Sequence, residues 1–186
     1  SRRGRAFEQS FIKNLNLMID SVKDYKEIAD KLHLRLGDID LKEGDSRKVE
    51  LHDNSIDGII TSPPYSIALD YVENDAHSLE DMGYKLNEIR EDFVCVRGKG
   101  KERVDLYNND IQKSYDEMYR ILKPNKYAVI VIGNATYQGQ EVKTVEFTID
   151  YMTEIGFKLE KNILKIIFGL YNVMKKENIL IFRKAK

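Results

Sequence analysis

Hydrophobic side chains recur at steps of three and four residues from Ala6 to His33, which is the spacing of an amphipathic helix. Beyond that segment, short apolar runs alternate with further helical patterns. We expect strands at residues 39–43, 55–60, 127–132, 157–168 and 178–183, and helices at residues 80–89, 105–122 and 143–155. Strands that alternate with helices predict an α/β fold with a mainly parallel sheet, to which the last two strands add an antiparallel pair.

The strongest local signal is Thr61-Ser62-Pro63-Pro64-Tyr65, which directly follows the second predicted strand. Because proline fixes φ and lacks an N–H group, two adjacent prolines end a strand in a stiff corner. Open α/β sheets bind ligands at such carboxyl ends of buried strands. The hydroxyl of Ser62 and the flat ring of Tyr65 are suited to holding a planar polar ring. A lone Pro-Pro pair, however, is more often an ordinary turn with a surface tyrosine.

Composition narrows the class of protein. The chain has 186 residues with 42% hydrophobic content, which predicts one globular domain with a real core. Its net charge of -1 gives no global basic field, so a nucleic-acid contact requires a local patch. The single cysteine, Cys95, excludes an internal disulfide and is typical of a reducing compartment, so we expect a cytoplasmic protein. No long apolar stretch follows the basic N-terminus, so we expect neither a signal peptide nor a membrane span.

One segment, residues 97–103, is locally basic. Its sequence is Arg-Gly-Lys-Gly-Lys-Glu-Arg, with four cationic side chains against one acid. Charge runs of this kind are usually solvated loops. The functional alternative is a mobile arm that contacts nucleic-acid phosphate through Arg97, Lys99, Lys101 and Arg103. Both interpretations stay open at this point.

Three local matches together resemble a known family. They are Ser62-Pro63-Pro64-Tyr65 after an apolar strand, Gly44-Asp45-Ser46 ahead of it, and residues 119–125 followed by the strand at 127–132. The sequence resembles the amino-group methyltransferases that use S-adenosylmethionine, specifically the DNA N4-cytosine branch, over roughly residues 6–184. Variants of this motif that begin with Asp or Asn mark adenine, guanine or glutamine amino groups, so Ser62 favours cytosine. The resemblance implies a Rossmann-like methyltransferase sheet.

The resemblance also implies roles for individual residues. Ser62 and a carbonyl of the corner, which Pro63 and Pro64 stiffen, would accept hydrogen bonds from the cytosine amine and free its lone pair. Tyr65 would stack on the base after it leaves the duplex. Catalysis would rest on positioning, with neither a metal nor a cysteine nucleophile. On the cofactor side, Asp45 and its neighbour Ser46 would contact the adenine end of S-adenosylmethionine, and Thr61 would lie beside its methionine end.

One part of the family pattern is missing. The family binds its cofactor through a glycine-rich turn after the first strand, where only glycine cheaply permits close backbone approach. Here Gly4 is the only glycine before Gly37, and no predicted strand precedes it. We therefore expect residues 1–186 to form one partial catalytic domain that lacks the first two strands. A missing N-terminal segment or a companion polypeptide would supply the glycine-rich half. The third reading is a chain that has lost its cofactor site and kept another role.

The leading hypothesis is the catalytic-motif half of a DNA N4-cytosine methyltransferase from a restriction-modification or host-protection setting. Residues 75–105 would form a small insertion that contacts the target. Within the same class, the alternatives are a DNA N6-adenine methyltransferase and an RNA base methyltransferase. From a different class, the alternative is a non-catalytic subunit that binds nucleic acid.

Overall fold

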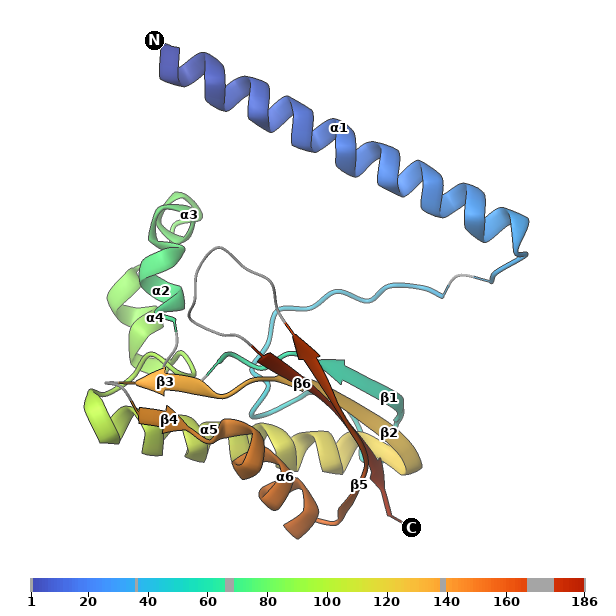
Figure 1. Cartoon of the computed structure of the whole chain (residues 1–186), viewed down its shortest axis with the longest axis vertical. Helices are drawn as coiled ribbons and strands as arrows, with labels where there is room; N and C mark the ends of the chain where they lie inside the picture. Colours follow the sequence, from blue (N-terminus) through green and yellow to red (C-terminus); the bar gives the residue numbers. More distant parts are fainter. Residues whose placement is uncertain (1, 36, 66–68, 138–139, 167–175, 186) are drawn as a thin grey trace. The chain divides into compact units, whose positions relative to one another are not determined.

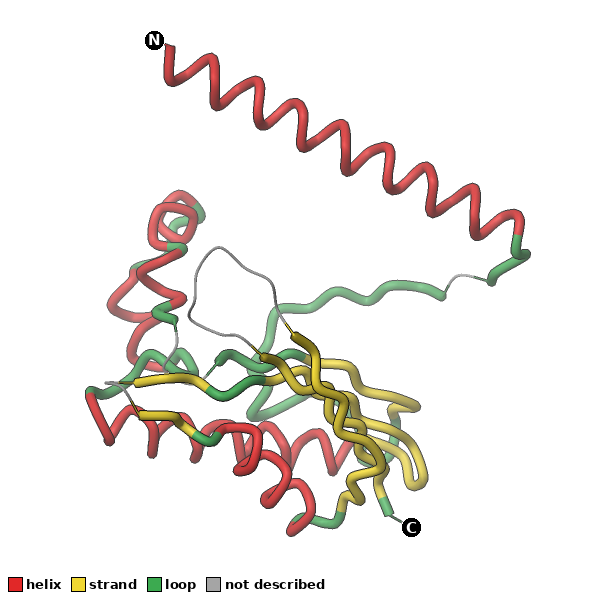
Figure 2. The backbone as a smooth tube through the Cα atoms, viewed as in Figure 1, coloured by secondary structure: helices red, strands yellow, loops and turns green. Residues whose placement is uncertain are grey.

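The computed structural model describes residues 2–35, 37–65, 69–137, 140–166 and 176–185 (Figures 1 and 2). The chain divides into two compact units, Ser1–Glu43 and Gly44–Lys186. Among the described residues, none of the helices is both long enough and apolar enough to cross a membrane.

The first unit is dominated by helix α1, Arg2–Lys31, which confirms the helix expected from Ala6 to His33. Its end is closed by His33, whose φ of 51° lets the backbone N–H of Leu34 return to the carbonyl of Ala29 at 2.9 Å. The strand predicted at residues 39–43 is wrong, because this segment carries no regular secondary structure. Ile39 and Leu41 alternate as in a strand but are 91% and 92% exposed, and a strand needs a neighbour for its backbone hydrogen bonds.

The second unit is built on a four-stranded sheet of order β1-β2-β6-β5. Its members are β1 (Ile56–Thr61), β2 (Leu122–Ile132), β5 (Phe157–Ile166) and β6 (Lys176–Lys184). β1 and β2 run parallel, whereas β6 is antiparallel to both β2 and β5. The expected antiparallel pair at the end of the chain is thus confirmed, apart from residues 167 and 168, which lie outside the described part. Within that described part, the parallel portion of the sheet consists of the single pair β1–β2.

Among its described residues, the connection from β1 to β2 holds four helices. They are α2 (Tyr71–Asn74), α3 (Ala76–Asp81), α4 (Leu86–Asp92) and α5 (Gly100–Ile121). The continuous helix predicted at 80–89 is wrong, since Gly83 adopts a φ of 87° and separates α3 from α4. The helix predicted at 105–122 is confirmed, but it begins earlier, at Gly100. After β2 come a small hairpin that the sequence pattern did not predict, β3 (Ala135–Tyr137) with β4 (Gln140–Val142), and then the expected helix α6 (Thr144–Glu154).

The core lies on the face of the sheet that packs against α5 and α6 (Figure 1). Alternate residues of β2 and β6 are fully buried there, including Ile130, Leu180 and Phe182. The other face carries the cross-strand row Ile60, Val129 and Ile181, and Ile60 is 83% exposed. Within the described part of the chain, β1 pairs with a strand on one side only.

A buried lysine ties the end of α5 to the last strand. Lys184 is 7% exposed, and its ammonium donates to the carbonyls of Tyr119 and Leu122 at 2.6 and 2.8 Å and to Asn54 Oδ1 at 2.8 Å. The same nitrogen lies 4.4 Å from the centre of the Tyr119 ring. Burial lowers the pKa of Lys184. The cation satisfies carbonyls at the α5 C-terminus, where the helix ends before β2 begins.

Candidate functional site

The Ser-Pro-Pro corner follows β1 directly. Thr61 is the last residue of that strand, and Pro63 is buried while Ser62 is exposed. β1 contains no buried residue, so the buried strand expected before the motif is wrong. A chain that ends a strand with two prolines has few backbone conformations left, so the corner is stiff before any other contact is made. The exposed side chain of Ser62 begins this corner, and it lies within hydrogen-bonding reach of the Tyr65 side chain.

Two tyrosines from other elements hold the backbone of this corner. The hydroxyl of Tyr107, in the buried part of α5, donates to the carbonyl of Pro64 at 3.0 Å. The backbone N–H of Tyr65 donates to the hydroxyl of Tyr71, in α2, at 3.3 Å. Neither tyrosine was a predicted site residue. Since Pro64 and Tyr107 lie 43 positions apart, no local pattern in the sequence signals their contact.

The side chain of Tyr65 has a partner of its own. Its hydroxyl donates to Oε1 of Glu177, the second residue of β6. The other carboxylate oxygen, Oε2, accepts from the ammonium of Lys165 at 3.3 Å. Burial, followed by the hydrogen bond to Glu177, raises the pKa of Tyr65 to about 12. The phenol therefore keeps its proton at neutral pH and remains a donor.

The predicted cofactor residues lie in a turn that is fastened to α5. The Asp45 carboxylate accepts the backbone N–H of Arg47 at 2.8 Å and its guanidinium at 2.9–3.1 Å. Those hydrogen bonds to Arg47 hold the pKa of Asp45 below its usual value. Ser46 lies 3.0 Å, hydroxyl to hydroxyl, from Ser114 of α5. Asp45 is thus placed and ionised, although part of its bonding capacity is taken by Arg47.

Arg47 stands at the centre of three carboxylates. Besides Asp45, its guanidinium contacts Asp92 at 2.8 Å and the buried Asp110 at 3.4 Å. Asp45 and Asp92 raise the pKa of Arg47, with the hydrogen bond to Asp45 as the largest cause. Asp110 also receives a hydrogen bond from Arg97. The turn at Asp45 and the basic segment are therefore joined through one buried carboxylate.

The four predicted nucleic-acid contacts fall into two groups. The guanidinium of Arg97 binds Asp110, and that of Arg103 donates to the carbonyl of Cys95 at 2.7 Å. Lys99 and Lys101 are exposed. Because α5 begins at Gly100, the segment is part loop and part first helical turn.

Cys95 is buried, as expected for a small apolar residue. Its φ of 80° is unusual for a residue with a side chain. Burial raises the pKa of Cys95 to about 11. The thiol therefore stays protonated at neutral pH, which makes it a poor nucleophile.

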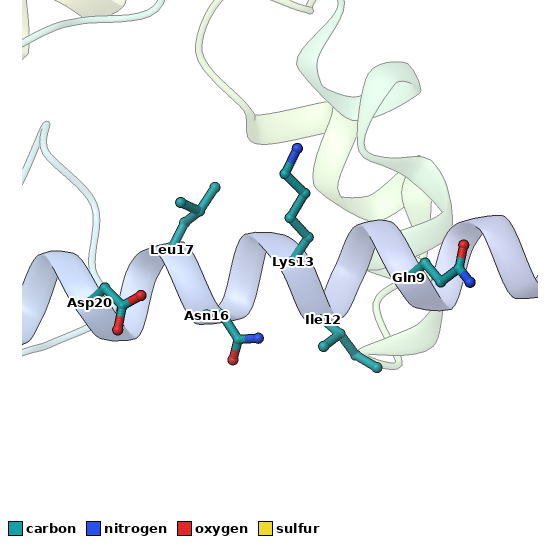
Figure 3. Close-up of a pocket in the computed structure, with 6 residues that line it drawn as sticks. All are labelled: Gln9, Ile12, Lys13, Asn16, Leu17 and Asp20. Carbon is teal, nitrogen blue, oxygen red and sulfur yellow. The ribbon is translucent and has the colours of Figure 1, made fainter.

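Among the described residues, no group of three His, Cys, Asp or Glu side chains could hold a metal ion. A surface depression of about 440 Å³ lies on α1 (Figure 3). All of its lining residues belong to that helix: Gln9, Ile12, Lys13, Asn16, Leu17 and Asp20. A second depression, of about 450 Å³, is lined by residues 48–52 together with Glu117 and Arg120 of α5. None of the predicted site residues lines either depression.

The residues present fit S-adenosylmethionine only in part. A close approach of the protein backbone to the cofactor needs a glycine turn that leads from a parallel strand into a helix. In the described part of the chain, Gly58 lies inside β1 and Gly133 leads from β2 to the hairpin. Gly98 precedes α5 and Gly100 begins it, but both follow the short loop after helix α4 and not a strand. The described residues thus contain no such turn.

The solved structures to which this one is similar include two methyltransferases. One is TTHA0409 from Thermus thermophilus, described as a "Putative DNA Modification Methylase", with a TM-score of 0.50 and 20% identity over 77% of this chain and 52% of that chain. The other is the PvuII DNA methyltransferase, described as cytosine-N4-specific, with a TM-score of 0.54 and 16% identity over 76% of this chain and 48% of that chain. This chain therefore spans about half the length of each.

The sequence comparisons give no match. No family model matches the chain, and no curated protein is similar enough in sequence to match it. What the structural likenesses do show is that the chain has the α/β, Rossmann-like fold of the methyltransferases, as the sequence predicted.

Proposed function

We propose that this chain is the catalytic-motif half of an S-adenosylmethionine-dependent methyltransferase that modifies the exocyclic N4 amine of cytosine in DNA. One observation carries the proposal: Ser62-Pro63-Pro64-Tyr65 forms a stiff corner at the carboxyl end of β1, in a methyltransferase fold, with Tyr107 fixing the carbonyl of Pro64. The description of the PvuII enzyme as cytosine-N4-specific supports the choice of cytosine. The serine in the motif supports the same choice.

The corner would act on the amine by geometry alone. An exocyclic base amine is a poor nucleophile because its lone pair is delocalised into the ring. Ser62 Oγ would accept one N–H of the amine. Because Tyr107 already donates to the carbonyl of Pro64, we assign the second contact to the carbonyl of Pro63. Acceptors that are held still before the reaction stabilise the tetrahedral nitrogen without reorganisation cost, while the ring of Tyr65 stacks on the flipped base.

On the cofactor side, we propose contacts from Asp45, Ser46 and Thr61. Bound S-adenosylmethionine would supply an electrophilic methyl group. Since the described residues lack the glycine turn, we propose that a further N-terminal segment or a companion polypeptide contributes it. The outer side of β1, with Ile60 83% exposed, is the place in the sheet where a further strand would pair. The coverage of about half of each neighbour supports this division.

For the DNA, we propose contacts along the basic segment within a target-contacting insertion at residues 75–105. Lys99 and Lys101, which are exposed, would meet phosphate directly. Arg97 and Arg103 are bound to Asp110 and to the carbonyl of Cys95, so their first effect would be to shape the segment. A restriction-modification or host-protection role is part of the same proposal, supported by the description of TTHA0409 as a DNA modification methylase.

The test is methylation of DNA and RNA with labelled S-adenosylmethionine by the complete protein or complex, followed by nucleoside analysis. We expect N4-methylcytosine from DNA. Ser62→Ala should lower turnover strongly, whereas Ser10→Ala, at an exposed serine of α1, should leave it unchanged. Methylation of adenine alone would overturn the cytosine assignment, and full turnover in Ser62→Ala would overturn the mechanism.

A second candidate function is a non-catalytic subunit that binds nucleic acid. The lack of a glycine turn among the described residues favours it. Calorimetric titration with S-adenosylmethionine separates the two functions. This candidate is correct if the chain binds DNA but neither binds the cofactor nor gains methylation activity with any companion polypeptide.

A further inference from the structure

We propose that Glu177 is a positioning residue that fixes the ring of Tyr65 as the surface on which the target base stacks. The proposal rests on the proposed function, because it gives Tyr65 the role of stacking partner. It adds a residue from the opposite end of the chain, 112 positions from Tyr65, to the acceptor side of the site.

The first argument is that Tyr65 is held at both of its ends. Its backbone N–H donates to the hydroxyl of Tyr71, and its own hydroxyl donates to Glu177. Two attachment points, one at the backbone and one at the far end of the ring, restrict rotation about the side-chain bonds. A stacking surface that is ordered before the base arrives costs less entropy when the base binds.

The second argument is that Glu177 is itself fixed. It lies near the start of β6, directly across from Lys165 of β5 in the antiparallel ladder. The ammonium of Lys165 binds Oε2 at 3.3 Å, which leaves Oε1 to Tyr65. The Glu177 side chain is only 13% exposed. A carboxylate with one oxygen for each partner and little exposure holds one orientation, and through it the sheet sets the position of the ring.

The third argument concerns what the tether leaves available. The interaction with Glu177 uses only the hydroxyl at the edge of the ring and occupies neither π-face of Tyr65, although the half-buried ring also packs against the hydrophobic core. A base stacks on such a face. The raised pKa of Tyr65 is consistent with this arrangement, since the phenol keeps the proton that the hydrogen bond needs.

The test is a double-mutant cycle of Tyr65→Phe and Glu177→Ala in the complete methylating protein or complex. Each single change removes the tether, and we expect kcat/KM for DNA to fall about tenfold, the value of a hydrogen bond to a charged group. We expect the double variant to be no worse than either single variant, because Glu177 acts through Tyr65. Glu177→Gln keeps an oxygen that can accept from the phenol and should restore most of the activity.

The matched control is Glu160→Ala. Glu160, in β5, is likewise a sheet carboxylate with a cationic cross-strand partner, Arg183 at 2.8 Å, but the structure gives it no contact with Tyr65. A role confined to strand pairing would give both glutamates the same effect on unfolding and none on kcat/KM. Unchanged kcat/KM in Glu177→Ala, or losses that multiply in the double variant, would overturn the positioning role while leaving the proposed function intact.

A wild-type complex that methylates no base would overturn the proposed function instead. In that case, thermal unfolding of the wild type, the two single variants and the double variant still tests the tether. Non-additive midpoints would support a coupled Tyr65–Glu177 pair, and additive midpoints would overturn it.

Discussion

The change Tyr107→Phe tests whether the corner depends on its hydrogen bond from α5. The change removes one oxygen and keeps the aromatic ring. Because Tyr107 is only 1% exposed, the retained ring preserves the packing of α5. The carbonyl of Pro64 then loses the donor that lies 3.0 Å away. A hydrogen bond of this kind contributes about 1 kcal/mol to the free energy of unfolding. For a domain of this size, that loss lowers Tm by about 2–4 °C.

The effect on catalysis should exceed the effect on stability. With the carbonyl released, the corner can shift, and a misplacement of about 1 Å at a positioned group costs about 100-fold in rate. We expect a lower kcat with an unchanged KM for the cofactor, because the acceptor side alone is disturbed. The assay is steady-state methylation of DNA by the complete protein or complex, run beside a thermal melt.

The matched control is Tyr115→Phe. Tyr115 is also buried in α5, and its hydroxyl lies 3.0 Å from Thr148 Oγ1, away from the corner. Both changes should lower Tm by similar amounts, but only Tyr107→Phe should lower kcat. If both variants lose stability and neither loses kcat, the carbonyl of Pro64 has no part in setting the site.

Three further predictions concern stability and DNA binding. Lys184→Met leaves three oxygen acceptors without their donor and should lower the free energy of unfolding by about 3 kcal/mol, as measured by denaturant titration. The control Lys161→Met, at an exposed lysine, should leave the free energy of unfolding unchanged. Asp45 has a lowered pKa, so its ionised form stabilises the folded chain at pH values above 3.8, the pKa of the unfolded chain. This contribution is lost as the pH falls through the pKa of the folded chain, and Asp45→Asn should flatten that part of the acid unfolding curve. Replacing Lys99 and Lys101 with Gln should reduce the slope of log K for DNA against log salt by about 1.8, and an undiminished slope would exclude both from phosphate contact.

The regular elements were largely predictable, because their periodicity reflects burial on one side. The alternation in β2 matches a strand with one face in the core, and the spacing in α5 matches a helix with one buried face. The prediction at residues 39–43 failed because the same alternation appears in a segment without a pairing strand. Periodicity reports which side chains are apolar, whereas a strand also requires a partner.

The candidate site could be proposed from the sequence only where its residues are adjacent. The motif from Ser62 to Tyr65 was visible because two adjacent prolines are rare and stiff. Tyr107 and Glu177 were not, since the fold brings them to the corner from distant elements. The bond from Arg97 to the buried Asp110 was hidden for the same reason. In a run of charged residues, the sequence does not distinguish a solvated cation from one that binds a buried carboxylate.

The single-sided pairing of β1, within the part of the chain that the structure describes, has a practical consequence for anyone who purifies this protein. A strand with unpaired N–H and C=O groups and an exposed isoleucine is a template for edge-to-edge aggregation. The charge in β1, Asp57, is held by Lys123 and Lys126, which weakens it as a gatekeeper against such association. We therefore expect the isolated chain to precipitate at concentrations where co-expression with a polypeptide that covers this edge keeps it in solution.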